Sequence, residues 1–408
     1  MATNTLTSGP VMRRTHRAIA VFAVLFALFV ACTGLAIQMM DLGALLGHAP
    51  AADPTIQAIH AGLNGPPNFQ VIRDADYSAQ PLPADFDYQA SLKTVMASAR
   101  TALKGRPASF VQWRMTDGKP VGEVATGKTR LAFDAVSGAQ LGPPVKFKFE
   151  PISTPSLRNT LKDYHRMRGL NGWLILLDMT VGLTLIAMIL TGLTLYLRLY
   201  QPRAKSGQAS PFWSAGGVWR SLHRSVAICA SLFLLVMATS GTILSVSSMG
   251  VTLNGVLNHG KRPGITNDLS QPLTDAELPG LLGVTLAANR AAGGEPEIRV
   301  LRLRYYAGMP QGVVVTGGDA EQRVFNAQTG RRVSLTEPNY PAPGQTFGWQ
   351  VDETVKMIHR GDYFGLTGRW IDLISGFCLL YLAISGAAVY LKLWANRRRS
   401  GRPGLFWS

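Results

Sequence analysis

Four long segments of the 408-residue chain are apolar and carry almost no charge. They are Ala18–Met40, Trp173–Leu197, Val226–Met249 and Trp370–Trp394. A helix needs about 20 apolar residues to cross a bilayer, and each segment reaches that length. The pattern therefore predicts an α-helical integral membrane protein with four transmembrane helices in contact with membrane lipid.

The two segments that separate the first span from the second, and the third from the fourth, have the mixed pattern of an α+β domain. Each is predicted to contain a helix and then strands, and to end near a tight turn, Asp134–Gly138 in the first and Asn326–Gly330 in the second. The predicted elements are Tyr88–Lys104, Ser109–Met115 and Lys128–Phe133, and then Asp275–Arg290, Glu297–Tyr306 and Gly312–Thr316.

The second half of the chain repeats the first. Six positions lie 194 residues after an identical or similar residue: His165 and His359, Asp178 and Asp372, Gly182 and Gly376, Thr191 and Ser385, Gly192 and Gly386, Tyr196 and Tyr390. The first and third spans share an offset of 207 residues: Arg13 and Arg220, His16 and His223, Arg17 and Arg224, Thr33-Gly34 and Ser240-Gly241. So many matches in one register predict two tandem halves, each with two spans around one α+β domain.

The formal net charge of +16 is unevenly placed. Basic residues gather before the first span, between the second and third, and after the fourth, and residues 197–224 contain no acidic residue. In a four-span chain these three groups lie on one side, so the positive-inside rule predicts a bacterial inner (cytoplasmic) membrane protein with both termini cytoplasmic. This placement argues against nucleic acid as a partner.

The expected organisation has nine parts. In chain order they are a cytoplasmic tail (1–12), transmembrane helix 1 (13–40), periplasmic domain 1 (41–164), transmembrane helix 2 (165–198), a basic cytoplasmic loop (199–222), transmembrane helix 3 (223–249), periplasmic domain 2 (250–357), transmembrane helix 4 (358–394) and a cytoplasmic tail (395–408).

Three segments carry a resemblance to a known family. Residues 131–141 (LAFDAVSGAQL) and 323–333 (RVFNAQTGRRV) resemble the end of a PepSY domain, and residues 359–370 (HRGDYFGLTGRW) resemble the PepSY-associated transmembrane family. The resemblance implies a periplasmic PepSY-like domain in each half. It also implies a relation to iron-regulated inner-membrane proteins and siderophore-iron reductases that carry haem. The first half departs from the pattern, because its HRMRGLNGW segment is shorter and lacks the usual Gly two residues after His165. In the second half, Asn326 replaces the usual aspartate.

Four histidines lie at the ends of the predicted spans, His16 and His223 at the cytoplasmic ends and His165 and His359 at the outer ends. Two imidazoles on facing helices of a bundle can bind one haem iron. We therefore expect two b-type haems, the inner one held by His16 with His223 and the outer one by His165 with His359. The glycines of the repeated pairs would let a macrocycle or a neighbouring helix approach closely. The simpler interpretation, that these histidines anchor helix ends at the membrane surface, stays open.

The outer histidines pose a geometric question. On straight helices of about 1.5 Å per residue, His165 and His359 would stand roughly 10 Å or more beyond the apolar core. Breaks at Gly169–Gly172 and Gly365–Gly368 would fold each histidine back toward the bundle.

Two carboxylates, Asp178 and Asp372, lie inside apolar spans. They are candidates for proton uptake or for orienting a ligand, and the alternative is a polar contact between helices. His48 and His259 follow the first and third spans and are expected at the surface, with a role at the outer site as the minor alternative. No pattern assigns a role to His60, and no nicotinamide, flavin or zinc motif is evident.

These observations and the resemblance predict a reductase that passes electrons across the membrane to ferric, siderophore-bound iron in the periplasm. The electrons would come from a cytoplasmic donor protein or from a quinol. Two alternatives are a non-enzymatic PepSY module that binds or inhibits a periplasmic protease, and a siderophore permease.

Overall fold

Four long helices make up most of the described chain. The computed structural model describes residues 8–49, 53–56, 58–59, 79–127, 129–146, 156–167, 172–208, 210–257, 272–293, 297–306, 309–316, 322–333, 346–402 and 404–405. In this part of the chain four helices are long and apolar enough to cross a membrane, which confirms the predicted number of spans. They are α1 (Ser8–Leu46), α6 (Ile175–Lys205), α7 (Val218–Leu257) and α10 (Gly365–Arg399).

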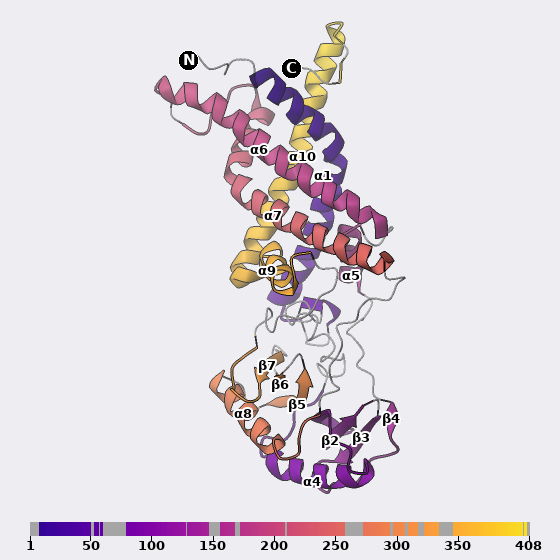
Figure 1. The fold of residues 1–408 in the computed structure, drawn as a ribbon. Coiled ribbons are helices and arrows are strands. Elements are labelled where there is room, and N and C mark those ends of the chain that lie inside the picture. Colours follow the sequence, from indigo (N-terminus) through magenta and orange to yellow (C-terminus); the bar gives the residue numbers. More distant parts are fainter. Residues whose placement is uncertain are drawn as a thin grey trace, which may run out of the picture.

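The long helices form a four-helix bundle. Helices α1 and α7 each pack against both α6 and α10, so every helix has two neighbours in the ring. The start of α1 and the end of α10 lie at one end of the bundle, and a β-sheet lies beyond the other end (Figure 1). We call the end nearest the sheet the sheet side, and the opposite end the far side.

Two short helices precede the second and fourth spans. Helix α5 (Leu157–His165) packs on α1, and helix α9 (Trp349–His359) packs on α7. Short 3-10 turns, η1 (Gly172–Leu174) and η2 (Asp362–Phe364), then lead into α6 and α10. Each histidine therefore ends a short helix of its own, and the long helix of its span begins only after a break.

Backbone geometry explains these breaks. After α9, Gly361 and Gly365 have φ values of 74° and 58°, in the left-handed region that glycine enters at little cost. After α5, Met167 has a φ of 55°. The break expected at Gly365–Gly368 thus begins four residues earlier, at Gly361. Of the other expected break, residues 169–171 lie outside the described part of the chain.

Strands from both α+β segments form one antiparallel sheet in the order β4-β3-β2-β1-β5-β6-β7. The strands are β1 (Phe110–Thr116), β2 (Lys119–Thr126), β3 (Thr129–Asp134), β4 (Val145–Lys146), β5 (Ile298–Tyr306), β6 (Met309–Thr316) and β7 (Gln322–Asn326). The segments meet where β1 pairs with β5 and Phe110 lies opposite Arg304. The predicted strands are confirmed to within about three residues, and β2 was not predicted.

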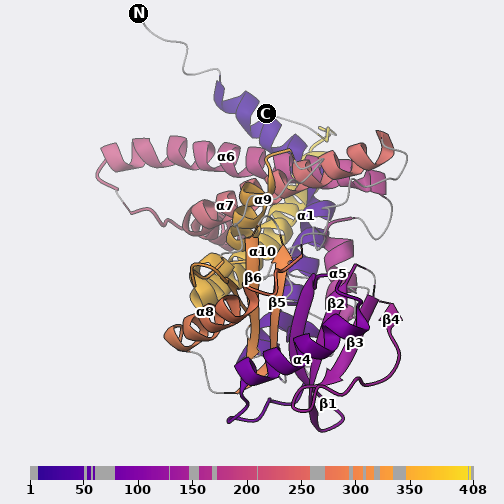
Figure 2. The same ribbon diagram turned by 60° about the horizontal axis from the view of Figure 1, so that its bottom comes forward.

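Helices α4 (Tyr88–Ala102) and α8 (Leu278–Ala291) pack on the sheet (Figure 2). Apolar side chains recur every three or four residues along α4, so one face of the helix is buried. The resulting core is shared by the two segments and includes Trp113, Phe133, Leu282 and Phe325, all almost fully buried.

Candidate functional site

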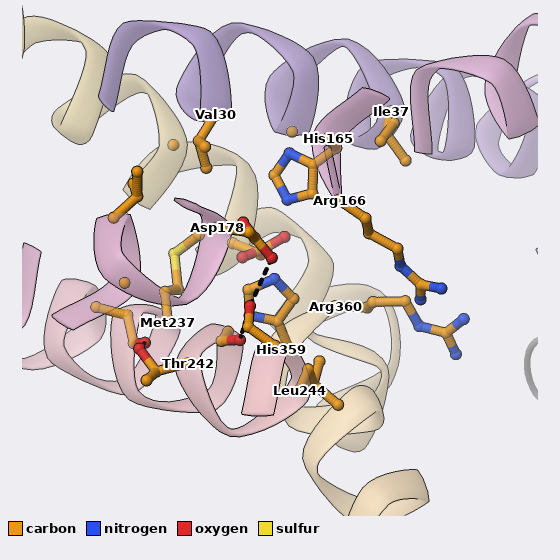
Figure 3. Close-up of a pocket in the computed structure, with 18 of the residues that line it drawn as sticks. Val30, Ile37, His165, Arg166, Asp178, Met237, Thr242, Leu244, His359 and Arg360 are labelled. Atoms are coloured by element: carbon orange, nitrogen blue, oxygen red, sulfur yellow. Dashed lines mark hydrogen bonds between the residues drawn. The ribbon is translucent and has the colours of Figure 1, made fainter. Parts of the chain in front are cut away.

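A cavity of about 330 Å³ lies among the four long helices on the sheet side of the bundle. Its wall is mostly apolar, and both His165 and His359 line it (Figure 3). Pockets that bind organic ligands in proteins have volumes of about 300–1,000 Å³, are lined mainly by apolar side chains and contain a few polar groups. The cavity has this character.

The two histidines of the cavity face each other. Their ring centroids are 6.4 Å apart, and the ring planes are inclined by 39°. The Nδ1 atom of His165 lies 2.9 Å from the hydroxyl of Thr33 on α1, and that of His359 lies 3.0 Å from the hydroxyl of Ser240 on α7. The breaks after α5 and α9 therefore bring both histidines back against the long helices.

The same contact recurs on the far side. The Nδ1 atom of His16 lies 2.8 Å from the hydroxyl of Thr191, and that of His223 lies 2.8 Å from the hydroxyl of Ser385. All four contacts thus join a histidine to the Ser or Thr of a repeated Ser/Thr-Gly pair. Sequence analysis identified these pairs but did not predict that the hydroxyl would bind the imidazole.

The glycine of each pair gives the imidazole its space. A Cβ atom added at Gly34 would lie 3.1 Å from Cε1 of His165, and one at Gly241 would lie 3.1 Å from Cε1 of His359. The corresponding distances are 3.4 Å from Gly192 to His16 and from Gly386 to His223. The close neighbour of each glycine is therefore an imidazole of this chain.

The hydroxyls also influence which ring nitrogen carries the proton. Each hydroxyl donates its hydrogen to a carbonyl of its own helix: Thr33 to Phe29, Thr191 to Ala187, Ser240 to Val236 and Ser385 to Leu382. With its hydrogen so placed, the hydroxyl oxygen faces the ring as an acceptor, which favours a hydrogen on the histidine Nδ1. In that tautomer the lone pair of Nε2 is available to a metal ion.

The two carboxylates also line the cavity. Asp178 accepts a hydrogen bond of 2.5 Å from the hydroxyl of Ser245, and Asp372 accepts one from the amide of Gln38. Ser245 lies 207 residues after Gln38, which is the offset between the first and third spans. Each aspartate thus makes a polar contact with a neighbouring helix, which was one interpretation of these residues. Both aspartates also line the cavity.

A buried ionic network closes the sheet side of the cavity. Asp41 at the end of α1 binds Arg158 on α5 at 2.5 and 2.8 Å, and Arg369 on α10 at 3.0 Å. Arg369 also binds Asp362 at 2.6 Å. Asp41 and Arg158 are each 2% exposed, so the network is shielded from water.

Lys162 stands beside this network, and among the described residues no ion pair joins it to a carboxylate. Burial, together with the nearby charges of Arg166, Arg158 and Arg360, lowers the pKa of Lys162 to about 7. Among the other predicted residues, His48 is exposed, and His60 and His259 lie outside the described residues.

The family model described as the PepSY-associated TM region matches residues 48–392. The chain belongs to the PepSY-associated TM region family. The resemblance found in the sequence is thus confirmed, and membership together with the four apolar helices makes this a membrane protein of that family. No match was found among curated proteins.

The ionic network is expected to hold the short helices on the bundle. Asp41→Ala would leave the buried Arg158 and Arg369 without this carboxylate, and breaking a buried ion pair in this way costs about 3–5 kcal/mol. The apparent unfolding temperature of the purified protein in detergent should fall by several degrees.

The matched control is Asp275→Ala, because Asp275 pairs with Arg100 at the surface. Exposed pairs contribute about 0–1 kcal/mol, so this variant should unfold near the wild-type temperature. Equal behaviour of the two variants would show that the network does not stabilise the bundle.

Proposed function

We propose that the protein is a haem-containing reductase that passes electrons across the bacterial inner membrane to ferric iron in the periplasm. His165 and His359 would hold one b-type haem, and His16 and His223 a second. The observation that carries the proposal is the fourfold contact between a Ser or Thr hydroxyl and a histidine Nδ1, which leaves four Nε2 atoms available as ligands.

The geometry of the sheet-side pair fits a metal ion between the rings. An imidazole nitrogen binds a first-row metal ion at about 2 Å, and the ring centroid lies about 1 Å behind it, so two rings on one ion have centroids about 6 Å apart. The centroids of His165 and His359 are 6.4 Å apart. Within the described residues no group of three or more His, Cys, Asp or Glu side chains could hold a metal ion. A haem iron differs from a bare metal ion because the porphyrin supplies most of its ligands, so two histidines from the protein would suffice.

The positions of the two pairs favour transfer across the bilayer. His165, a sheet-side histidine, contacts Thr33 of α1. On that helix Thr33 lies 17 residues after His16 (33 − 16), which is about 25 Å along the helix axis. The offset between His223 and Ser240 on α7 is also 17 (240 − 223). When bound, haem would supply a centre that accepts and releases one electron at each of these levels.

The remaining parts of the proposal concern direction and substrate. The distribution of basic residues supports cytoplasmic termini and, with them, a periplasmic sheet. The repeated positions support two tandem halves, and residues 131–141 and 323–333 support PepSY-like domains. A cytoplasmic donor protein or a quinol would supply one electron for each ferric ion. A siderophore complex is the substrate that the family resemblance implies, and reduction weakens the hold of hard oxygen ligands because Fe(II) is the softer ion.

Asp178 and Asp372 have a supporting role in this scheme. Both line the cavity that contains the sheet-side histidines, and each is fixed by a hydrogen bond from a neighbouring helix. A carboxylic group in this position can take up a proton when negative charge arrives nearby, so that charge in the apolar interior stays balanced.

An absorption spectrum tests the proposal. The detergent-purified protein should contain about two haems per chain and show the sharp reduced bands of six-coordinate b-type haem after dithionite. His16→Ala and His359→Ala should each retain about one haem, whereas the exposed His48→Ala should retain both. A colourless protein, even after expression with added haem, would contradict the proposal and favour a protease-binding module.

The hydroxyl contact has a separate test. Thr191→Val removes the acceptor of the His16 Nδ1 hydrogen, and loss of such an outer contact typically costs 10–100-fold in metal affinity. Thr194→Val is the matched control, because the Thr194 hydroxyl lies on the same helix and bonds to a carbonyl of that helix. Haem dissociation from the far-side site, followed by transfer to apomyoglobin, should accelerate only in Thr191→Val, and equal rates would exclude this role for the hydroxyl.

A further inference from the structure

Basic side chains flank both histidines of the cavity. Lys162 and Arg166 stand before and after His165, and Lys356 and Arg360 stand at the corresponding positions around His359, 194 residues later. All four line the cavity. In Figure 3, the side chains of Arg166 and Arg360 extend to the same side of the cavity, beyond the two imidazoles.

These cations differ in how their charge is balanced. Lys356 has carboxylates of its own helix at 2.6 and 3.9 Å, from Glu353 and Asp352. Arg360 contacts Asp362 at 2.6 Å, but that carboxylate is shared with Arg369. The buried Nε atom of Arg360 has no hydrogen-bond acceptor within the described residues.

The charges around Lys162 are mainly positive. The charges that act on it come from three arginines, Arg166, Arg158 and Arg360, and from one carboxylate, Asp163. Asp163 is exposed on the surface of α5, where water screens its charge. A half-buried lysine among three guanidinium groups is a site that attracts an anion from outside the chain.

The haem of the proposed function would bring anionic groups of suitable charge and position to this site. A b-type haem has two carboxylate groups on short flexible arms at one edge of the ring. In a mostly apolar cavity these carboxylates need cationic partners, because an unpaired buried charge is costly. Guanidinium groups bind carboxylates through two parallel hydrogen bonds, and an ammonium group adds a compact charge.

Resting on the proposed function, we infer that Lys162, Arg166 and Arg360 bind the two carboxylates of the porphyrin held by His165 and His359. The porphyrin edge that carries the carboxylates then faces α5 and α9, and the apolar edge faces the long helices. The cations thus fix which way round the ring enters the cavity, while the imidazoles bind the iron.

Titration with haem b and with its dimethyl ester tests this inference, because the ester has the same ring and iron but no carboxylate charge. The protein would be produced without haem in a His223→Ala background, which removes a ligand of the far-side site. Binding at the sheet-side site is followed by the Soret absorbance of each ligand.

Lys162→Gln and Arg166→Gln should each weaken haem b binding by about tenfold, which corresponds to about 1.4 kcal/mol. Neither should change binding of the dimethyl ester by more than about twofold, since the ester offers no charge to the cation. Lys93→Gln, which removes an exposed lysine on α4, is the control and should leave both affinities unchanged.

Other results would overturn the inference in distinct ways. Equal weakening for haem b and the ester would mean that the cations only maintain the fold of the cavity. Unchanged haem affinity with a raised KM for an anionic ferric chelate would assign the cations to the substrate. Absence of a Soret band with either ligand in the parent protein would refute haem binding itself and with it the proposed function.

Discussion

The hydrogen bond between a Ser or Thr hydroxyl and a histidine Nδ1 is the contact on which the rest of the bundle depends. It occurs four times, and each time it joins two different helices, α1 with α5 or α6 and α7 with α9 or α10. Because the hydroxyl hydrogen is directed to a carbonyl of its own helix, the contact also favours the tautomer with the hydrogen on Nδ1. One interaction therefore sets both the packing of the helices and the chemistry available in the cavity.

The ionic network beside the cavity is not repeated along the chain. Asp41 and Arg369 belong to the buried ionic network, whereas the positions related to them by the offsets of 207 and 194 residues are Ser248 and Ile175. Neither of these side chains can replace a charge. The cavity is therefore bordered by an ion-paired network that has no charged counterpart at these two related positions.

The number of spans could be predicted because hydrophobic length is a local signal. The repeat placed His165 and His359 at corresponding positions, and these two rings lie together in the structure. The sequence did not predict the pairing of β1 with β5, since that contact joins segments about 190 residues apart (Gln112 and Arg302). Strand β2 was missed because Pro120, Gly122 and the buried Glu123 interrupt its apolar pattern. The return of His165 and His359 to the bundle depends on left-handed backbone at Met167 and Gly361, which spacing alone does not reveal.

Proteoliposomes that contain the protein show whether electrons cross the bilayer through it. A membrane-impermeant reductant would be enclosed, with a ferric chelate and a ferrous-specific dye outside. The account predicts ferrous iron outside with the wild-type protein and none with either His16→Ala or His359→Ala, because the path needs both haems. Wild-type vesicles that reduce their haem but form no external ferrous iron would contradict it.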